Sequence, residues 1–233
     1  MQKRLEKGVF TYGSRGPVKR RWSSIESDWS MYGIWSMMPV YMPSYTLSPR
    51  YTPLVQKPFC CNVTCLMMIL YRHGFGLFDQ EALAEFFKIK IPRSVQAYFN
   101  VKLPHLKSKR EEGGMRTIDS KNLVNKFFKK HKIQLHAVDV KASNIKNLHK
   151  FISEHLRMNH DLWVEYKSHE IHREDAVHDN VIESIRRTKT GAFVTLIDPF
   201  SEHKTRFEVP IAKIERAISD KFGRETGFLV ITR

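Results

Sequence analysis

The feature that most constrains the fold is an almost wholly apolar stretch at residues 61–73, CNVTCLMMILYRH, which begins within a cluster of three cysteines. Leu66, Ile69 and Leu70 follow the spacing of one helix face, and methionine and valine residues occupy the other faces. A helix that is apolar nearly all round has to be buried at the centre of a domain. The sequence therefore predicts a central helix here, which ends at Gly74.

The rest of the chain after this stretch divides into helical and strand patterns of ordinary length. Amphipathic periodicity predicts helices over residues 79–89, 119–132, 143–159 and 210–222. Alternating or β-branched stretches predict strands over residues 133–140, 161–167, 180–187, 191–199 and 227–233. Because most helices come first and most strands later, we expect an α+β fold with a buried N-terminal helix packed on an antiparallel sheet.

The first 50 residues differ in character from the remainder. Residues 28–53 are rich in Trp, Tyr, Met and Pro but show no helical or strand period. Repeated prolines interrupt any long element, and the aromatic content is too apolar for a disordered tail. We therefore expect residues 1–50 to form an N-terminal extension that wraps the surface of a single domain at residues 51–233. An arm that covers a functional groove is the alternative.

The chain is strongly basic, with a formal net charge of +15. Lysine and arginine concentrate in two clusters, at residues 3–21 and 107–132, and the second cluster overlaps a predicted exposed basic loop at residues 100–116. Such clusters raise the affinity for any polyanion, but they are equally consistent with a solvated surface. No zinc-finger spacing or RNA-binding signature accompanies the charge.

The cysteine content and the hydropathy indicate the cellular compartment to expect for this protein. Cys60, Cys61 and Cys65 are the only cysteines, and an odd, clustered set is unlike a disulfide framework. Free thiols are typical of a reducing compartment, so we expect a cytoplasmic protein. No apolar run reaches the roughly 18 residues of a membrane span, and no secretory signal opens the chain. The sequence does not predict an oligomeric state.

A thiol nucleophile is the chemistry that the residue pattern favours. Cys61 opens the predicted central helix, where the helix dipole is expected to lower the pKa of a thiol. His178 precedes one predicted strand and Asp198 ends the next, so a hairpin would bring them together at one end. The carboxylate could then orient the imidazole as a general base. Gln56 lies just before the helix and could help to bind an oxyanion.

These residues occur in an order that resembles the bacteriocin-leader-processing, double-glycine branch of papain-like cysteine peptidases. The pattern of that family runs roughly Q…CG-x-x-[CS]-L…G…QE-x-L-[AG], followed by H-x-x-V-[VI], a strand and D-P. The matching parts of this chain are Gln56, Cys61 with Cys65 and Leu66, Gly74, QEALA at 80–84, HDNVI at 178–182 and DP at 198–199. Asn62 stands where the family pattern has glycine.

The resemblance covers residues 52–233 and implies a papain-like fold with a Cys61–His178–Asp198 triad and Gln56 as an oxyanion donor. It implies a cysteine hydrolase that acts on a peptide or acyl-amide substrate and needs no cofactor. Acyl or peptidyl transfer would use the same triad and remains open. A catalytically inactive papain-like domain that serves as a basic binding module for polyanions or proteins is a further alternative.

A metal site is a weaker interpretation of one other segment. Residues 168–179, SHEIHREDAVHD, contain His169, His172, His178 and several carboxylates. The histidine spacing does not match the H-E-x-x-H helix of zinc peptidases, and a polar loop explains the composition equally well. The sequence therefore predicts no metal ligands.

Overall fold

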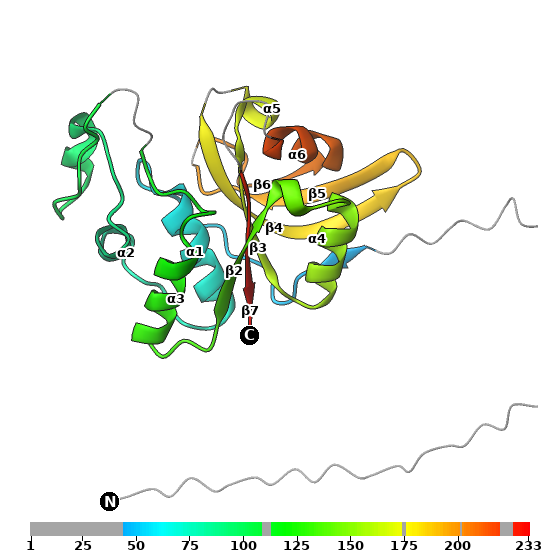
Figure 1. The fold of residues 1–233 in the computed structure, drawn as a ribbon, viewed down its shortest axis with the longest axis horizontal. Coiled ribbons are helices and arrows are strands. Elements are labelled where there is room, and N and C mark those ends of the chain that lie inside the picture. The colour runs from blue at the N-terminus through cyan, green and yellow to red at the C-terminus, as the bar shows by residue number, and fades with distance from the viewer. Residues whose placement is uncertain (1–43, 109–112, 174–175, 201, 220–225) are drawn as a thin grey trace, which may run out of the picture. The chain divides into compact units, whose positions relative to one another are not determined.

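Helix α1, Cys61–Arg72, is the predicted central helix, and ten of its 12 residues are buried. The computed structural model describes residues 44–108, 113–173, 176–200, 202–219 and 226–233. In Figure 1, α1 lies beside the sheet with α2, Gln80–Phe86, and α3, Lys121–Lys130, on the same side. Helices α4, Leu148–Arg157, and α6, Ile211–Ile218, lie on the other side. The sheet is therefore covered on both faces.

The sheet has seven strands, and all of its pairings are antiparallel. The order along the sheet is β2-β7-β3-β4-β5-β6, with β1 paired to β4 outside this path. The bounds are Tyr45–Thr46 for β1, His136–Lys141 for β2, Asp161–Lys167 for β3, Val177–Thr188 for β4, Gly191–Ile197 for β5, Arg206–Pro210 for β6 and Gly227–Thr232 for β7. Helices packed on an antiparallel sheet confirm the expected α+β class.

The longest predicted helices and strands are found, and the differences are local. Helix α4 begins at Leu148, because the side chain of Asn147 caps it by accepting a hydrogen bond from the backbone N–H of Lys150, and the preceding Ala142–Asn144 form a 3₁₀ turn. Strand β6, the short helix α5, His169–His172, and the 3₁₀ helix at Arg93–Tyr98 were not predicted. All three are too short to show a clear period.

His178 lies inside a strand rather than before one. Strand β4 begins at Val177 because residues 177–179 continue the ladder with β3, where Tyr166 pairs with His178 and Glu165 with Asp179. Asp198 directly follows β5, which forms the predicted hairpin with β4. The tertiary pairing of β3 thus extends the strand by three residues through a polar segment that has weak strand propensity of its own.

Part of the predicted extension joins the sheet. Tyr45 and Thr46 pair with β4, and Leu47 is buried in the core. The wrapping predicted for residues 1–43 lies outside the described residues.

A buried ionic network anchors the far end of α1 to the sheet. Arg72 ends the helix and contacts the Asp161 carboxylate at 2.7 Å, at the start of β3. His73 and the Tyr51 hydroxyl contact the same carboxylate, each at 2.6 Å. Because buried charges are costly unless paired and hydrogen-bonded, this network fixes the position of α1 against β3. The first turn of α1 is then held near β4, with which the helix is also in contact.

No helix among the residues that the structure describes is both long enough and apolar enough to cross a membrane.

Candidate active site

Cys61 is the first residue of α1 and differs from the other two cysteines in its exposure. Cys60 and Cys65 are fully buried, whereas Cys61 keeps part of its surface exposed. The turn before the helix places Phe59 at a positive φ of 64°, an uncommon backbone conformation for a residue other than glycine. Of the three thiols, only Cys61 is placed to meet a ligand.

His178 and Asp198 are in direct contact, as the predicted hairpin requires. The Nε2 atom of His178 lies 2.7 Å from Oδ1 of Asp198, and both side chains are buried. Burial opposes the ionisation of Asp198, but hydrogen bonds from His172 and His178 outweigh it and hold the pKa of Asp198 well below its usual value. This contact occupies Nε2 and leaves Nδ1 of His178 as the ring nitrogen that can accept a proton from a thiol.

Three of the four predicted site residues line one cavity of about 440 Å³. They are Gln56, Cys61 and His178, and Asp198 lies behind His178 without reaching the cavity surface. The other described lining residues are Phe59, Asn62, Gly113, Gly114, Met115, Arg116, Glu165, Ala176, Val177, Asp179 and Phe200. The structure therefore brings together residues that lie as far as 142 positions apart in the chain, from Gln56 to Asp198.

The Cys61 thiol has a partner that the sequence did not suggest for it. Its Sγ lies 3.3 Å from Oδ2 of Asp179, to which the thiol donates a hydrogen bond. Among the hydrogen bonds of the described residues, none joins Cys61 to His178. Burial, followed by the charge of Asp179, raises the pKa of Cys61 well above its usual value. The expected lowering by the helix dipole is therefore wrong for this arrangement, because burial and the nearby carboxylate outweigh the dipole.

Asp179 belongs to a buried acidic pair. It is paired across the strands with Glu165, and it accepts hydrogen bonds from the Thr117 hydroxyl and from Nε1 of Trp163. Burial raises the pKa of Asp179 to about 6. Burial and the charge of Asp179 raise the pKa of Glu165 to about 7, although Arg116 lies 3.0 Å away. Near neutral pH the two carboxyl groups therefore gain or lose protons, and one of them, Asp179, is hydrogen-bonded to the Cys61 thiol.

One signal in the sequence could have identified this pair. Glu165 is a charged residue in the middle of the buried strand DLWVEYK, and charged residues are almost never fully buried unless they are paired. Asp179 follows His178 directly, within both the HDNVI motif and the segment 168–179, and neither pattern indicates that it contacts Cys61.

Residues 100–116 are predicted to form an exposed loop, but the last four of them, residues 113–116, form one wall of the cavity. A Cβ on Gly113 would lie 2.3 Å from the ring of Phe59, so only glycine fits here. The side-chain amide of Asn62 donates to the backbone oxygen of Met115 at 2.5 Å. Asn62, where the resembling family has glycine, thus ties the start of α1 to this wall.

Gln56 is held next to the end of β5. Its backbone N–H donates to the oxygen of Pro199 at 2.8 Å, directly after Asp198. Its side-chain Oε1 is buried and has no hydrogen-bond partner among the described residues. An unpaired buried amide is costly, and such costs are tolerated mainly at functional sites.

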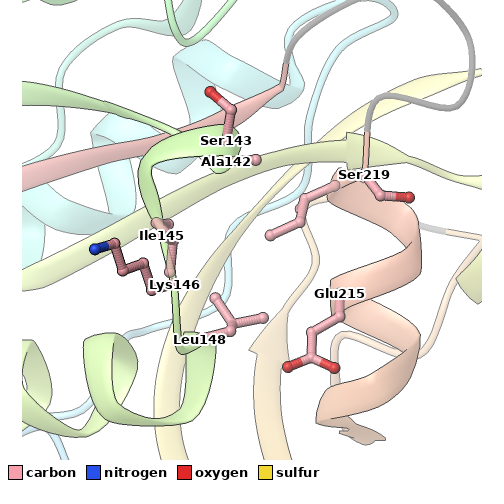
Figure 2. Close-up of a pocket in the computed structure, with 8 residues that line it drawn as sticks. Ala142, Ser143, Ile145, Lys146, Leu148, Glu215 and Ser219 are labelled. Carbon is pink, nitrogen blue, oxygen red and sulfur yellow. The ribbon is translucent and has the colours of Figure 1, made fainter.

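A second cavity, of about 360 Å³, lies between the segment that leads into α4 and helix α6 (Figure 2). Its described walls carry Ser143, Lys146, Glu215 and Ser219 among apolar residues. None of the described residues that line it carries a thiol or an imidazole, so these residues offer no nucleophile and base together.

The basic cluster at residues 107–132 is solvent-exposed in part. Lys129 and Lys130 of α3 are exposed, whereas Phe127 and Phe128 are buried in the core. The phenylalanines are therefore packing residues, and they cannot stack on a nucleic acid base.

Comparison with protein-family models gives no match to this chain, and comparison with curated proteins finds no similar sequence. The family resemblance of the motifs therefore rests on the residues themselves and on the site they form.

Proposed function

We propose that this chain is a papain-like cysteine hydrolase that cleaves an amide or peptide bond through Cys61, His178 and Asp198. The observation that carries the proposal is the contact between His178 Nε2 and Asp198 beside a cavity that Cys61 and Gln56 also line. A nucleophile, a base and an orienting carboxylate in one place are the requirements of this chemistry. The order of these residues along the chain is that of the resembling family.

The reaction begins with a proton transfer that the resting arrangement does not yet favour. The Cys61 thiol donates to Asp179, so it has to turn away from that carboxylate before Nδ1 of His178 can take its proton. Asp198 holds the imidazole by Nε2 and stabilises the imidazolium that forms. The thiolate and imidazolium pair can therefore form only after the thiol has left its hydrogen bond to Asp179, which keeps the thiol neutral.

The thiolate then attacks the substrate carbonyl. A bond forms between Sγ and the carbonyl carbon, and the carbonyl oxygen becomes an oxyanion. The backbone N–H of Cys61 is one of those that a helix start leaves without an intrahelical partner, and it can stabilise the oxyanion together with the Gln56 amide. Protonated His178 gives its proton to the leaving amine, and water hydrolyses the thioester with His178 as the base. No cofactor takes part.

A second function is favoured by the contact of Cys61 with Asp179. A thiol whose pKa is raised and whose hydrogen bond goes to a carboxylate is a weak nucleophile at neutral pH. This supports the alternative of an inactive papain-like domain that binds polyanions or proteins through its basic surface.

Alkylation of the thiols separates the two functions. We expect iodoacetamide at neutral pH to modify Cys61 before Cys60 or Cys65, and we expect the substitution His178→Ala to slow this reaction. His136→Ala is the matched control, because His136 is an exposed histidine on β2. Peptide mapping by mass spectrometry reports the site. Equal labelling of all three thiols, or labelling of Cys61 that His178→Ala does not change, would contradict the catalytic pair.

A substrate screen then identifies the reaction. We expect fluorogenic peptide or acyl amides to be cleaved by the wild-type protein and not by Cys61→Ala. The product formed without an added amine distinguishes hydrolysis from transfer, because a hydrolase releases the free acid with water alone, whereas a transferase needs an acceptor amine for rapid turnover. A chain that labels at Cys61 but turns over no amide would support the inactive binding domain instead.

A further inference from the structure

Asp198 is surrounded by more histidines than the proposed triad uses. Its Oδ1 atom contacts His178, and its Oδ2 atom lies 2.9 Å from Nδ1 of His203 and 3.2 Å from Nε2 of His172. His172 comes from α5, and His203 comes from the turn between β5 and β6. Two segments that the sequence separates by about 30 residues thus meet on the side of the carboxylate that faces away from the triad.

The two additional imidazoles are arranged as a pair. Their rings are stacked, with centroids 3.7 Å apart and planes within 7° of parallel. One nitrogen of each ring and one oxygen of Asp198 all lie within 4.8 Å of one another. The three potential donor atoms therefore converge on a single small volume.

The two distances from Asp198 Oδ2 are close to those around a tetrahedral metal ion, and the stacked imidazole rings would have to rotate so that both nitrogen lone pairs point at the ion. Zinc bonds of about 2.0–2.1 Å to nitrogen and oxygen place neighbouring ligand atoms about 3.3 Å apart. The separations of 2.9 Å and 3.2 Å from Asp198 Oδ2 need only small adjustments to reach that value. Two histidines and one carboxylate form a ligand set that divalent zinc accepts, with a fourth position for another group.

The surroundings provide a supporting shell and an entry route. The Tyr166 hydroxyl is fully buried and lies 3.1 Å from Nε2 of His172, so it stands beside the atom that would bind the ion and can hydrogen-bond to a group in the fourth position. The side chains of His172 and His203 are 10% and 11% exposed, whereas that of Asp198 is fully buried. An ion can therefore reach the nitrogens from solvent without unfolding of the domain.

We propose that His172, His203 and Asp198 bind one zinc ion directly behind the proposed triad. On binding, each imidazole takes the tautomer that carries its proton on the other ring nitrogen, so that Nε2 of His172 and Nδ1 of His203 are free to bind the ion. The ion then ties α5 to the turn between β5 and β6. Asp198 Oδ1 keeps its contact with His178, so the ion and the triad share one carboxylate. Residues 168–179, for which the sequence predicts no metal ligands, contribute only His172, since His203 and Asp198 come from elsewhere in the chain.

Calorimetric titration with zinc chloride tests the site. The protein is the full chain with the substitution Cys61→Ser, treated with EDTA and dialysed, so that the reactive thiol cannot bind the ion. We expect one zinc ion per chain and a higher melting temperature when zinc is present. We expect His203→Ala and His172→Gln each to weaken binding by at least about tenfold and to remove the thermal shift. His203→Cys is expected to retain binding, because a thiolate can replace the imidazole as a ligand.

Two substitutions serve as matched controls. His169→Ala removes an exposed histidine of the same helix α5, and His160→Ala breaks the other close histidine pair, in which His155 Nδ1 lies 3.0 Å from His160 Nδ1. Both are expected to leave zinc binding unchanged. Circular dichroism without metal confirms that each variant is folded.

An absence of binding, or equal affinity in the parent, His203→Ala and His172→Gln, would overturn the inference and leave a hydrogen-bond network around Asp198. Neither readout needs catalysis, so the result is independent of the alkylation experiment.

Discussion

Asp179 and Asp198 are buried carboxylates that adjoin the same histidine, one next to it in the chain and one in contact with its ring. Asp198 accepts hydrogen bonds from imidazoles and from the backbone N–H of Phe200, and its pKa is held low. Asp179 accepts from a hydroxyl, an indole and a thiol beside a second acid, and its pKa is raised. Burial raises the pKa of both, and only at Asp198 do the hydrogen-bond donors and neighbouring charges outweigh it.

The two aspartates act in opposite directions on the proposed enzyme. The ionised Asp198 can stabilise a positive imidazole, which a triad needs. The charge of Asp179 raises the pKa of the Cys61 thiol and so opposes formation of the thiolate. The site therefore contains one carboxylate, Asp198, that favours the thiolate and imidazolium pair and another, Asp179, that disfavours it.

The largest expected effect is a difference in protein stability between the variants Asp198→Asn and Asp179→Asn. Asp198→Asn places an amide N–H₂ group among hydrogen-bond donors, and we expect it to lower the free energy of unfolding by about 3 kcal/mol. Asp179→Asn removes a charge that burial already penalises, so we expect a change of less than about 1 kcal/mol. Urea denaturation with EDTA present measures both. Equal losses in the two variants would show that the two carboxylates do not differ as described.

A smaller effect concerns pH. Burial and the charge of Asp179 raise the pKa of Glu165 to about 7, so between about pH 4.5 and pH 7 the folded protein holds a proton that the unfolded chain releases. The stability from this group is full below that window and is lost as the pH rises through it. The contribution to the slope is at most about 1.4 kcal/mol per pH unit.

We therefore expect Glu165→Gln to lose less stability than the wild type between about pH 5 and pH 7.5, as measured by urea denaturation across that window. Glu208→Gln is the control, since Glu208 is a partly exposed residue paired with Arg186 and its pKa is lowered. An unchanged slope in Glu165→Gln would mean that the acidic pair does not hold a proton in this window.

The smallest expected effect is on the pKa of the Cys61 thiol and hence on its rate of alkylation. The charge of Asp179 is the second cause, after burial, of the raised pKa of Cys61. Asp179→Asn should therefore lower that pKa and speed the alkylation of Cys61, by up to about tenfold for each pKa unit recovered. The rate of iodoacetamide labelling against pH measures it, with Glu208→Gln again as the control. Slower labelling in Asp179→Asn would instead indicate that the Asp179 carboxylate acts as a base that takes the proton of the thiol.

Much of the fold was predictable because its elements have long, clear periods. Helix α1 is apolar on almost every face, and β3, β5 and β7 are apolar stretches of six or seven residues. Short elements such as α5 and β6 were missed, because four or five residues do not establish a period. The start of β4 was missed because pairing with β3 extends it through a polar segment.

The candidate site was predictable only in part. The hairpin of β4 and β5 follows from the sequence, and it brings His178 to Asp198 as expected. The partner of Cys61 did not follow, because Asp179 reaches the sulfur only through the packing of α1 on β4. Glu165 joins that pair through strand register, which no local pattern reports.

The sequence alone determined three features: a buried helix that begins at Cys61, an α+β fold, and a histidine and an aspartate at the same end of a hairpin. These depend on periodicity and on neighbouring residues. The tertiary structure decided how each ionisable group titrates and which imidazoles surround Asp198. Burial and the distances between charges set both, and those quantities exist only once distant segments have packed together.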